Sequence, residues 1–214
     1  IYDDIRLLCN LMNVPFIRAK GEADVLCAKL YLSGQVHAIM SEDSDILLYG
    51  GGRLIRKFNW TNEIEVLELN LILKSLNITY DQFIDLAILS GTDYTATTIG
   101  GLGPIAALDY IVKGLTIEQI IDHLRQSGNA RYHLPSEENF PYQDARTLIK
   151  NACQYELPVT IEPFNLQNMV YEQLISLMTD KCHYRAITIQ KHFDQLREIY
   201  RPPHPKIKIN LKKK

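Results

Sequence analysis

The chain has 214 residues, of which 46% are hydrophobic and 22% are charged, and its formal net charge at pH 7 is −2. These values indicate a soluble globular protein with one large domain, or one domain with a helical appendage. No apolar run approaches the roughly 18 residues of a membrane span, and the N-terminus lacks the pattern of a signal peptide, so we expect a nuclear or cytoplasmic protein that is neither secreted nor membrane-bound. The four cysteines lack the paired short spacing of a zinc site or a disulfide framework.

Charge is distributed unevenly along the chain. Residues 1–100 contain 8 Lys and Arg against 13 Asp and Glu, a difference of −5, whereas residues 101–214 contain 15 against 12, a difference of +3. The basic half is therefore the part that could face a polyanion. For residues 201–214, which are rich in lysine, we expect a basic, solvated and disordered tail; contact with nucleic acid or a nuclear address is the alternative.

The first third of the chain alternates between helical and strand patterns. Apolar residues recur at helical spacing up to Asn13, and a second helix is closed by Gly34. Strand, helix and strand at this spacing predict a βαβ unit with a parallel sheet. The predicted elements are a helix over 5–12, a strand over 14–19, a helix over 23–31, a strand over 36–40, a short helix over 46–49, and strands over 54–58 and 64–66.

After Leu67 the pattern becomes helical. Thr79 has the character of a helix cap and Gly91 that of a helix stop, so a helix is expected between them. We therefore divide the chain into an α/β region over 1–78, a helical region over 79–200 and the tail. Further helices are expected after Pro104 and near 116–127, 142–153, 170–180 and 184–199.

Five carboxylates lie where the chain should pass from a strand or loop into a helix. They are Glu22, Asp24, Asp43, Asp45 and Asp93. The first four follow predicted strands, at the edge of a parallel sheet where ligands bind. Crowded carboxylates raise each other's pKa, and a divalent cation is the usual compensation. The alternative is that they are ordinary caps and first-turn acids of helices, or, for Asp93, part of a helix-terminating turn.

The type of ligand narrows the choice of metal. Oxygen ligands without His or Cys indicate Mg²⁺ or Mn²⁺ rather than zinc. Two such ions a few ångströms apart are the standard apparatus of phosphodiester hydrolysis, because one orients and deprotonates water and the other stabilises the leaving oxygen.

A glycine-rich turn is the second signal. Gly101-Leu102-Gly103-Pro104 lies between two helix-like segments, where backbone N–H groups can hold a phosphate without side chains. This is how helix-hairpin-helix motifs contact the DNA backbone independently of sequence. A plain turn between two helices is the alternative.

Four motifs in this order and spacing resemble the flap endonuclease family of structure-specific 5′ nucleases. The motifs are Gly21-Glu22-Ala23-Asp24, Ser41-Glu42-Asp43-Ser44-Asp45, Leu89-Ser90-Gly91-Thr92-Asp93-Tyr94 and Ile99-Gly100-Gly101-Leu102-Gly103-Pro104. The resemblance runs from Ile1 to about Leu196. It implies an α/β fold: a partial, parallel-sheet PIN-like nuclease core over 1–78, followed by a helical region with a helix-hairpin-helix near 85–113.

The resemblance also implies an activity. Members of the family are magnesium-dependent endonucleases and 5′–3′ exonucleases that cut DNA with 5′ flaps, near single-strand/double-strand junctions, in replication and repair. By position, Glu22 and Asp24 match the acidic pair that binds the first metal ion. Asp43 and Asp45 match the pair for the second ion, and Asp93 matches a further carboxylate; we take all five as the catalytic and metal-binding set.

The same resemblance suggests how DNA is held. Gly91 would lie against the DNA backbone beside Glu22 and Asp93. Gly101, Gly103 and Pro104 match the hairpin that grips the duplex, which in relatives also holds K⁺ through backbone carbonyls.

Three departures from the family pattern matter. The family's N-terminal region, which supplies two more aspartates, has no counterpart here, so we expect the covered chain alone to be a weak nuclease or inactive. Ile105 and Ala106 stand where relatives tend to have Lys and Arg. There is no Gln-x-x-Leu-x-x-Phe-Phe motif at the C-terminus, so no sliding-clamp partner is predicted.

Two other functions compete with this interpretation. One is a catalytically incomplete DNA-binding module that keeps the hairpin without turnover. The other is a haloacid-dehalogenase-like phosphatase, because Asp43-Ser44-Asp45 after an apolar strand resembles its nucleophile loop. That chemistry wants Thr or Val where Leu47 stands and a later lysine, and neither is evident.

Overall fold

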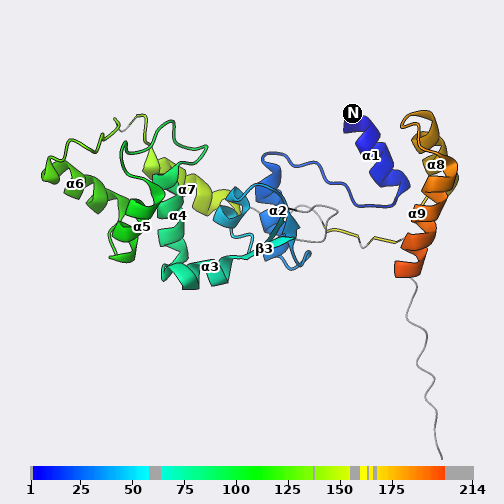
Figure 1. Cartoon of the computed structure of the whole chain (residues 1–214), viewed down its shortest axis with the longest axis horizontal. Coiled ribbons are helices and arrows are strands. Elements are labelled where there is room, and N and C mark those ends of the chain that lie inside the picture. Colours follow the sequence, from blue (N-terminus) through cyan, green and yellow to red (C-terminus); the bar gives the residue numbers. More distant parts are fainter. Residues whose placement is uncertain are drawn as a thin grey trace, which may run out of the picture. The chain divides into compact units, whose positions relative to one another are not determined.

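The computed structural model describes residues 2–57, 64–136, 138–154, 160–162, 164–165 and 168–200 (Figure 1). The chain divides into two compact units. We call Ala19–Thr160 the large unit, and Ile1–Arg18 together with Ile161–Lys214 the small unit. The predicted disordered tail lies outside the described residues, and the predicted division of the chain at residue 78 stays a prediction.

The small unit is built from three helices. These are α1 (Tyr2–Leu11), α8 (Tyr171–Asp180) and α9 (Ala186–Ile199), so the helices expected near 5–12, 170–180 and 184–199 are confirmed. Their apolar faces meet in a small core whose buried members are Leu11, Leu174, Ile189 and Phe193. The N–H of Val170 donates to the carbonyl of Leu11 at 2.9 Å, which ties the end of α1 to the start of α8.

The large unit begins with α2 (Ala23–Leu32) and a three-stranded sheet. The strands are β1 (Ile39–Met40), β2 (Arg53–Arg56) and β3 (Glu65–Glu68), in the order β1-β2-β3. β1 and β2 are parallel, with Ile39 opposite Leu54. β2 and β3 are antiparallel, so the expected parallel sheet is in fact mixed. The connection between β2 and β3 is too short for a parallel crossover, which needs a dozen or more residues.

The predicted strand over 14–19 is wrong. These residues lie in no strand, and the large unit begins within them, at Ala19. An apolar run becomes a strand only when a neighbouring strand satisfies its backbone and a core covers its side chains. Val14 and Phe16 are 36% and 44% exposed. The strand expected over 36–40 is likewise reduced to two residues, of which only Ile39 is buried.

A short 3₁₀ helix, η1 (Asp45–Tyr49), packs between α2 and the sheet. Four of its residues are buried, and Gly50 ends it with φ of 84°. α3 (Leu69–Leu76), which the sequence reading did not single out, follows β3 directly. The core of this part contains Ile39, Ile46, Leu47, Leu54 and Leu69. The helices predicted over 23–31 and 46–49 are confirmed.

The remaining helices of the large unit share a second core. They are α4 (Tyr80–Ser90), α5 (Pro104–Val112), α6 (Ile117–Ser127) and α7 (Tyr142–Ala152), and α4 packs against both α5 and α7 (Figure 1). Thr79 caps α4 through a reciprocal pair of hydrogen bonds with Gln82, as its sequence predicts. Within the part of the chain that the structure describes, no helix is long and apolar enough to cross a membrane.

One charged network joins three of these helices. Arg146 of α7 donates to Asp85 of α4 through Nε at 2.7 Å and through Nη2 at 3.1 Å. Its third nitrogen, Nη1, donates to Glu118 of α6 at 3.0 Å. Asp85 is only 9% exposed. Burial raises the pKa of Asp85, and the bond to Arg146 offsets part of that rise, so the carboxylate depends on the guanidinium.

We therefore expect Arg146→Met to lower the free energy of unfolding by about 3 kcal/mol, because it leaves a buried carboxylate without its partner. The matched control is Arg125→Met, which removes the exposed ion pair to Asp122 and should cost less than about 0.5 kcal/mol. Urea denaturation of both variants measures the difference. Equal losses of unfolding free energy in the two variants would contradict a stabilising role of the buried network.

Candidate functional site

The structure places all five predicted carboxylates in the large unit, at the starts of helices or just after one. Glu22 is the N-cap of α2 and makes no side-chain cap hydrogen bond, and Asp24 lies in the first turn. Asp43 Oδ1 accepts a hydrogen bond from the backbone N–H of Asp45 at 2.9 Å, which sets the start of η1. Asp93 lies in the loop after α4.

These side chains share one electrostatic environment. Burial raises the pKa of Asp45, and the charges of the other four raise it further; in decreasing order these are Asp43, Asp93, Asp24 and Glu22. Burial also raises the pKa of Asp24, again with contributions from Asp43 and Glu22. Within the described residues, no Lys or Arg forms an ion pair with any of the five. The negative charge here is therefore not balanced by basic side chains of this part of the chain.

The donor set fits a hard divalent cation, because it offers carboxylate oxygens and excess negative charge. Its geometry is looser than a coordination sphere. Over the described ranges, no three His, Cys, Asp or Glu side chains are grouped closely enough to hold a metal ion. The carboxylates thus interact through their charges, while their assignment as metal ligands stays a prediction.

Two tyrosines that the sequence reading gave no role contact this group. Tyr49 Oη lies 3.0 Å and Tyr94 Oη 3.2 Å from Glu22 Oε2, both at hydrogen-bonding distance, and the two hydroxyls are 2.5 Å apart. Burial raises the pKa of both hydroxyls, so both keep their hydrogen at neutral pH. The sequence offered one signal for these contacts, the position of Tyr49, whose polar hydroxyl comes at the end of an apolar run.

The glycine-rich turn connects α4 and α5 and is supported from one side. Gly100 and His133 exchange two backbone hydrogen bonds of 2.9 Å. Gly101 has φ of +82°, and a Cβ there would lie 2.2 Å from the carbonyl oxygen of Arg131. A Cβ on Gly103, by contrast, would meet no atom within 4 Å. Gly103 is the N-cap of α5 and Pro104 follows in the first turn, so this end of the turn is open.

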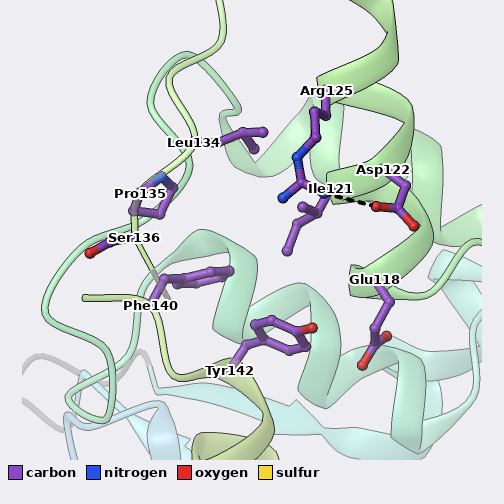
Figure 2. Close-up of a pocket in the computed structure, with 9 residues that line it drawn as sticks. All are labelled: Glu118, Ile121, Asp122, Arg125, Leu134, Pro135, Ser136, Phe140 and Tyr142. Carbon is purple, nitrogen blue, oxygen red and sulfur yellow. Dashed lines mark hydrogen bonds and ion pairs between the residues drawn. The ribbon is translucent and has the colours of Figure 1, made fainter. Parts of the chain in front are cut away.

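A separate pocket lies between α6 and a second group of residues, Leu134, Pro135, Ser136, Phe140 and Tyr142. Figure 2 shows the rings of Phe140 and Tyr142 on one side and side chains of α6 on the other, and the cavity volume is about 230 Å³. None of the predicted site residues lines it. Its acidic residues are already paired, Glu118 with Arg146 and Asp122 with Arg125. The carboxylate group is therefore the stronger candidate for chemistry.

Comparison with known proteins gives a consistent family. The XPG I-region family model matches residues 13–93, which include all five carboxylates. A probable flap endonuclease 1 homolog from Danio rerio is 43% identical over 157 residues, covering 72% of this chain and 43% of the relative. The chain spans less than half the length of that curated relative.

Solved structures agree on the fold. Flap endonuclease-1 from Methanococcus jannaschii superposes with a TM-score of 0.68 at 26% identity, covering 92% of this chain and 57% of that one. The Holliday junction-resolving enzyme GEN1, solved with product DNA and a Mg²⁺ ion, has a TM-score of 0.65 at 19% identity, covering 90% and 55%. These matches confirm the predicted α/β, PIN-like nuclease core followed by helices.

The raised pKa of Asp45 has a consequence for stability. A carboxyl whose pKa is higher in the folded than in the unfolded state contributes stability that is fully present below the unfolded pKa and is lost as the pH rises through the folded pKa. In metal-free buffer at pH 7, Asp45→Asn should therefore raise the free energy of unfolding by roughly 0.5 kcal/mol. The gain should shrink as the pH falls towards about 4. Thermal melts with EDTA test this, with exposed Asp109→Asn as the control; equal gains would contradict it.

The two glycines of the turn provide a matched pair. Gly101→Ala should cost about 2 kcal/mol of stability, because alanine is strained at positive φ and its Cβ collides with the Arg131 carbonyl. Gly103→Ala should cost less than about 0.5 kcal/mol, since its Cβ enters open space. Chemical denaturation of both variants checks the contrast. A loss at position 103 as large as at position 101 would refute it.

Proposed function

Because this chain belongs to the flap endonuclease family, we propose that it forms part of a Mg²⁺-dependent, structure-specific 5′ nuclease. Its substrate is DNA with a single-strand/double-strand junction and a 5′ flap, which it cuts as an endonuclease and trims as a 5′–3′ exonuclease. The setting of such a reaction is replication and repair. The haloacid-dehalogenase-like phosphatase and the non-enzymatic DNA-binding module are not favoured, because the relatives found are endonucleases and a junction-resolving enzyme.

A single observation supports the catalytic part of this proposal. Five carboxylates from three segments lie inside the stretch that matches the XPG I-region, and the charges of the other four add to the burial that raises the pKa of Asp45. Among the described residues, no Lys or Arg forms an ion pair with any of the five. Excess negative charge of this kind is stabilised by hard cations. GEN1, which shares the fold, was solved with Mg²⁺.

In the proposed mechanism, Glu22 and Asp24 hold one metal ion, and Asp43 and Asp45 hold a second. Asp93 adds a further carboxylate from the loop after α4. Two Mg²⁺ ions, or Mn²⁺ in their place, supply an activated water and a stabilised leaving oxygen when bound. The carboxylates of this chain also exclude other anions from the site, so that only a phosphate accompanied by cations can approach.

The hairpin positions the DNA in this proposal. Backbone N–H groups at Gly101, Gly103 and the first turn of α5 face a duplex phosphate, and Pro104 fixes the start of the helix. The carbonyls of the turn would hold K⁺. Gly91, with Glu22 and Asp93, lies against the DNA backbone.

The hairpin of this chain has little side-chain charge to add. Ile105, which follows Pro104, is 81% exposed and apolar, so the grip depends on backbone donors rather than cations. No sliding-clamp partner is proposed.

The decisive experiment uses the full-length protein and a 5′-flap DNA. Asp45→Ala should reduce single-turnover cleavage in Mg²⁺ by about 10³-fold or more, because a ligand of the reacting centre is lost. DNA affinity, measured by electrophoretic mobility shift in Ca²⁺, should stay within about threefold, because the hairpin is untouched. Asp109→Ala is the control. Cleavage that survives Asp45→Ala would eliminate the proposed mechanism.

A further inference from the structure

We propose that Tyr49 and Tyr94 are positioning residues that fix the carboxylate of Glu22 for metal binding. Their hydroxyls form a short hydrogen-bonded chain that ends on one oxygen of Glu22 and leaves the other oxygen for the cation. This inference rests on the proposed function, because it takes Glu22 to be a ligand.

The number of hydroxyl hydrogens determines how the two tyrosines and Glu22 are linked. Glu22 Oε2 lies 3.0 Å from Tyr49 Oη and 3.2 Å from Tyr94 Oη, and the two hydroxyl oxygens are 2.5 Å apart. The two hydroxyls supply only two hydrogens for these three contacts. Two hydroxyl oxygens at 2.5 Å need a hydrogen between them. One tyrosine therefore donates to the other, and the second donates to Glu22. In either order, Glu22 Oε2 accepts one hydrogen bond. This bond is stronger than one between neutral groups, because its acceptor is a charged carboxylate.

The second oxygen of Glu22 stays available. Among the described residues, Oε1 has no hydrogen-bond partner, and the side chain caps no N–H of α2. Glu22 is exposed, so without the tyrosines its side chain would lose rotamer freedom only when a ligand arrived. The hydroxyl chain supplies that ordering in advance.

The anchor on the η1 side is rigid. Tyr49 is 4% exposed, and its backbone carbonyl accepts a hydrogen bond from Cys153 Sγ at 3.1 Å. Gly50 then ends the helix in the left-handed region. Tyr94 belongs to the loop that also carries Asp93. The hydrogen bonds of the two hydroxyls therefore link the start of α2, the end of η1 and the loop after α4. Partners of metal ligands that hold them in this way typically change metal affinity 10–100-fold when removed.

The test measures Mn²⁺ binding to the 214-residue chain by the electron paramagnetic resonance signal of free Mn²⁺. Either tyrosine can reach Glu22 Oε2 alone, so Tyr49→Phe and Tyr94→Phe should each weaken binding about threefold. The double variant should weaken it at least about tenfold. Tyr80→Phe is the matched control, since that hydroxyl donates to the Leu48 carbonyl at 2.5 Å and belongs to no carboxylate contact in the described part of the chain.

A background without the Glu22 charge separates positioning from general stability. In Glu22→Gln, which should itself weaken Mn²⁺ binding, the double tyrosine substitution should cause no further loss, whereas a merely structural role would give the same loss in both backgrounds. If the double variant melts below the assay temperature, Tyr94→Phe in the two backgrounds decides the question.

Two negative results have different meanings. Unchanged Mn²⁺ affinity in the double variant, with a clear loss in Glu22→Gln, would overturn the positioning role and leave the proposed function intact. Unchanged affinity in Glu22→Gln itself would overturn Glu22 as a ligand in the proposed function, and the positioning role with it.

Discussion

Repulsion between like charges is the constraint on which the large unit depends. Five carboxylates from three segments lie close enough that the charges of four of them raise the pKa of the fifth, Asp45, so the fold must hold them together against their own charge. The holding is done by apolar packing beneath them: α2 and η1 are fixed on the sheet by one core, and the loop with Asp93 leaves a helix fixed in another. Such repulsion lowers the stability of the folded state, and a cation that binds only the folded state raises it again.

α4 connects the carboxylates to the hairpin. Its C-terminal end leads to Asp93 and then to the glycine-rich turn, and its middle is held by the bidentate contact between Asp85 and Arg146. The turn is held separately, by the backbone pairing of Gly100 with His133. Both parts of the proposed site therefore rest on contacts with the segment around α6 and α7, which carries no predicted site residue.

Local signals predicted most of the helices and failed where partners decide the structure. Thr79 and Gln82 cap α4 within four residues of sequence, so the boundary could be read directly. The run over 14–19 has strand-like residues, but no strand pairs with it among the residues that the structure describes. The antiparallel β3 follows from the short connection rather than from its composition. The carboxylates were predictable as a set because each begins a helix or follows one. The role of Tyr49 was not, since its contacts reach Glu22 and Tyr94, which are 27 and 45 positions away.

The division of the chain into units also has a consequence for the order of folding. The large unit is contiguous, whereas the small unit joins α1 to two helices that follow residue 160. Bringing Leu11 to Val170 closes a loop of more than 150 residues, an entropic cost that falls steeply once the intervening chain is compact. The large unit should therefore fold first, which lowers the entropic cost of bringing α1 to α8. Damage to the core of the large unit should then also slow the assembly of α1 with α8 and α9.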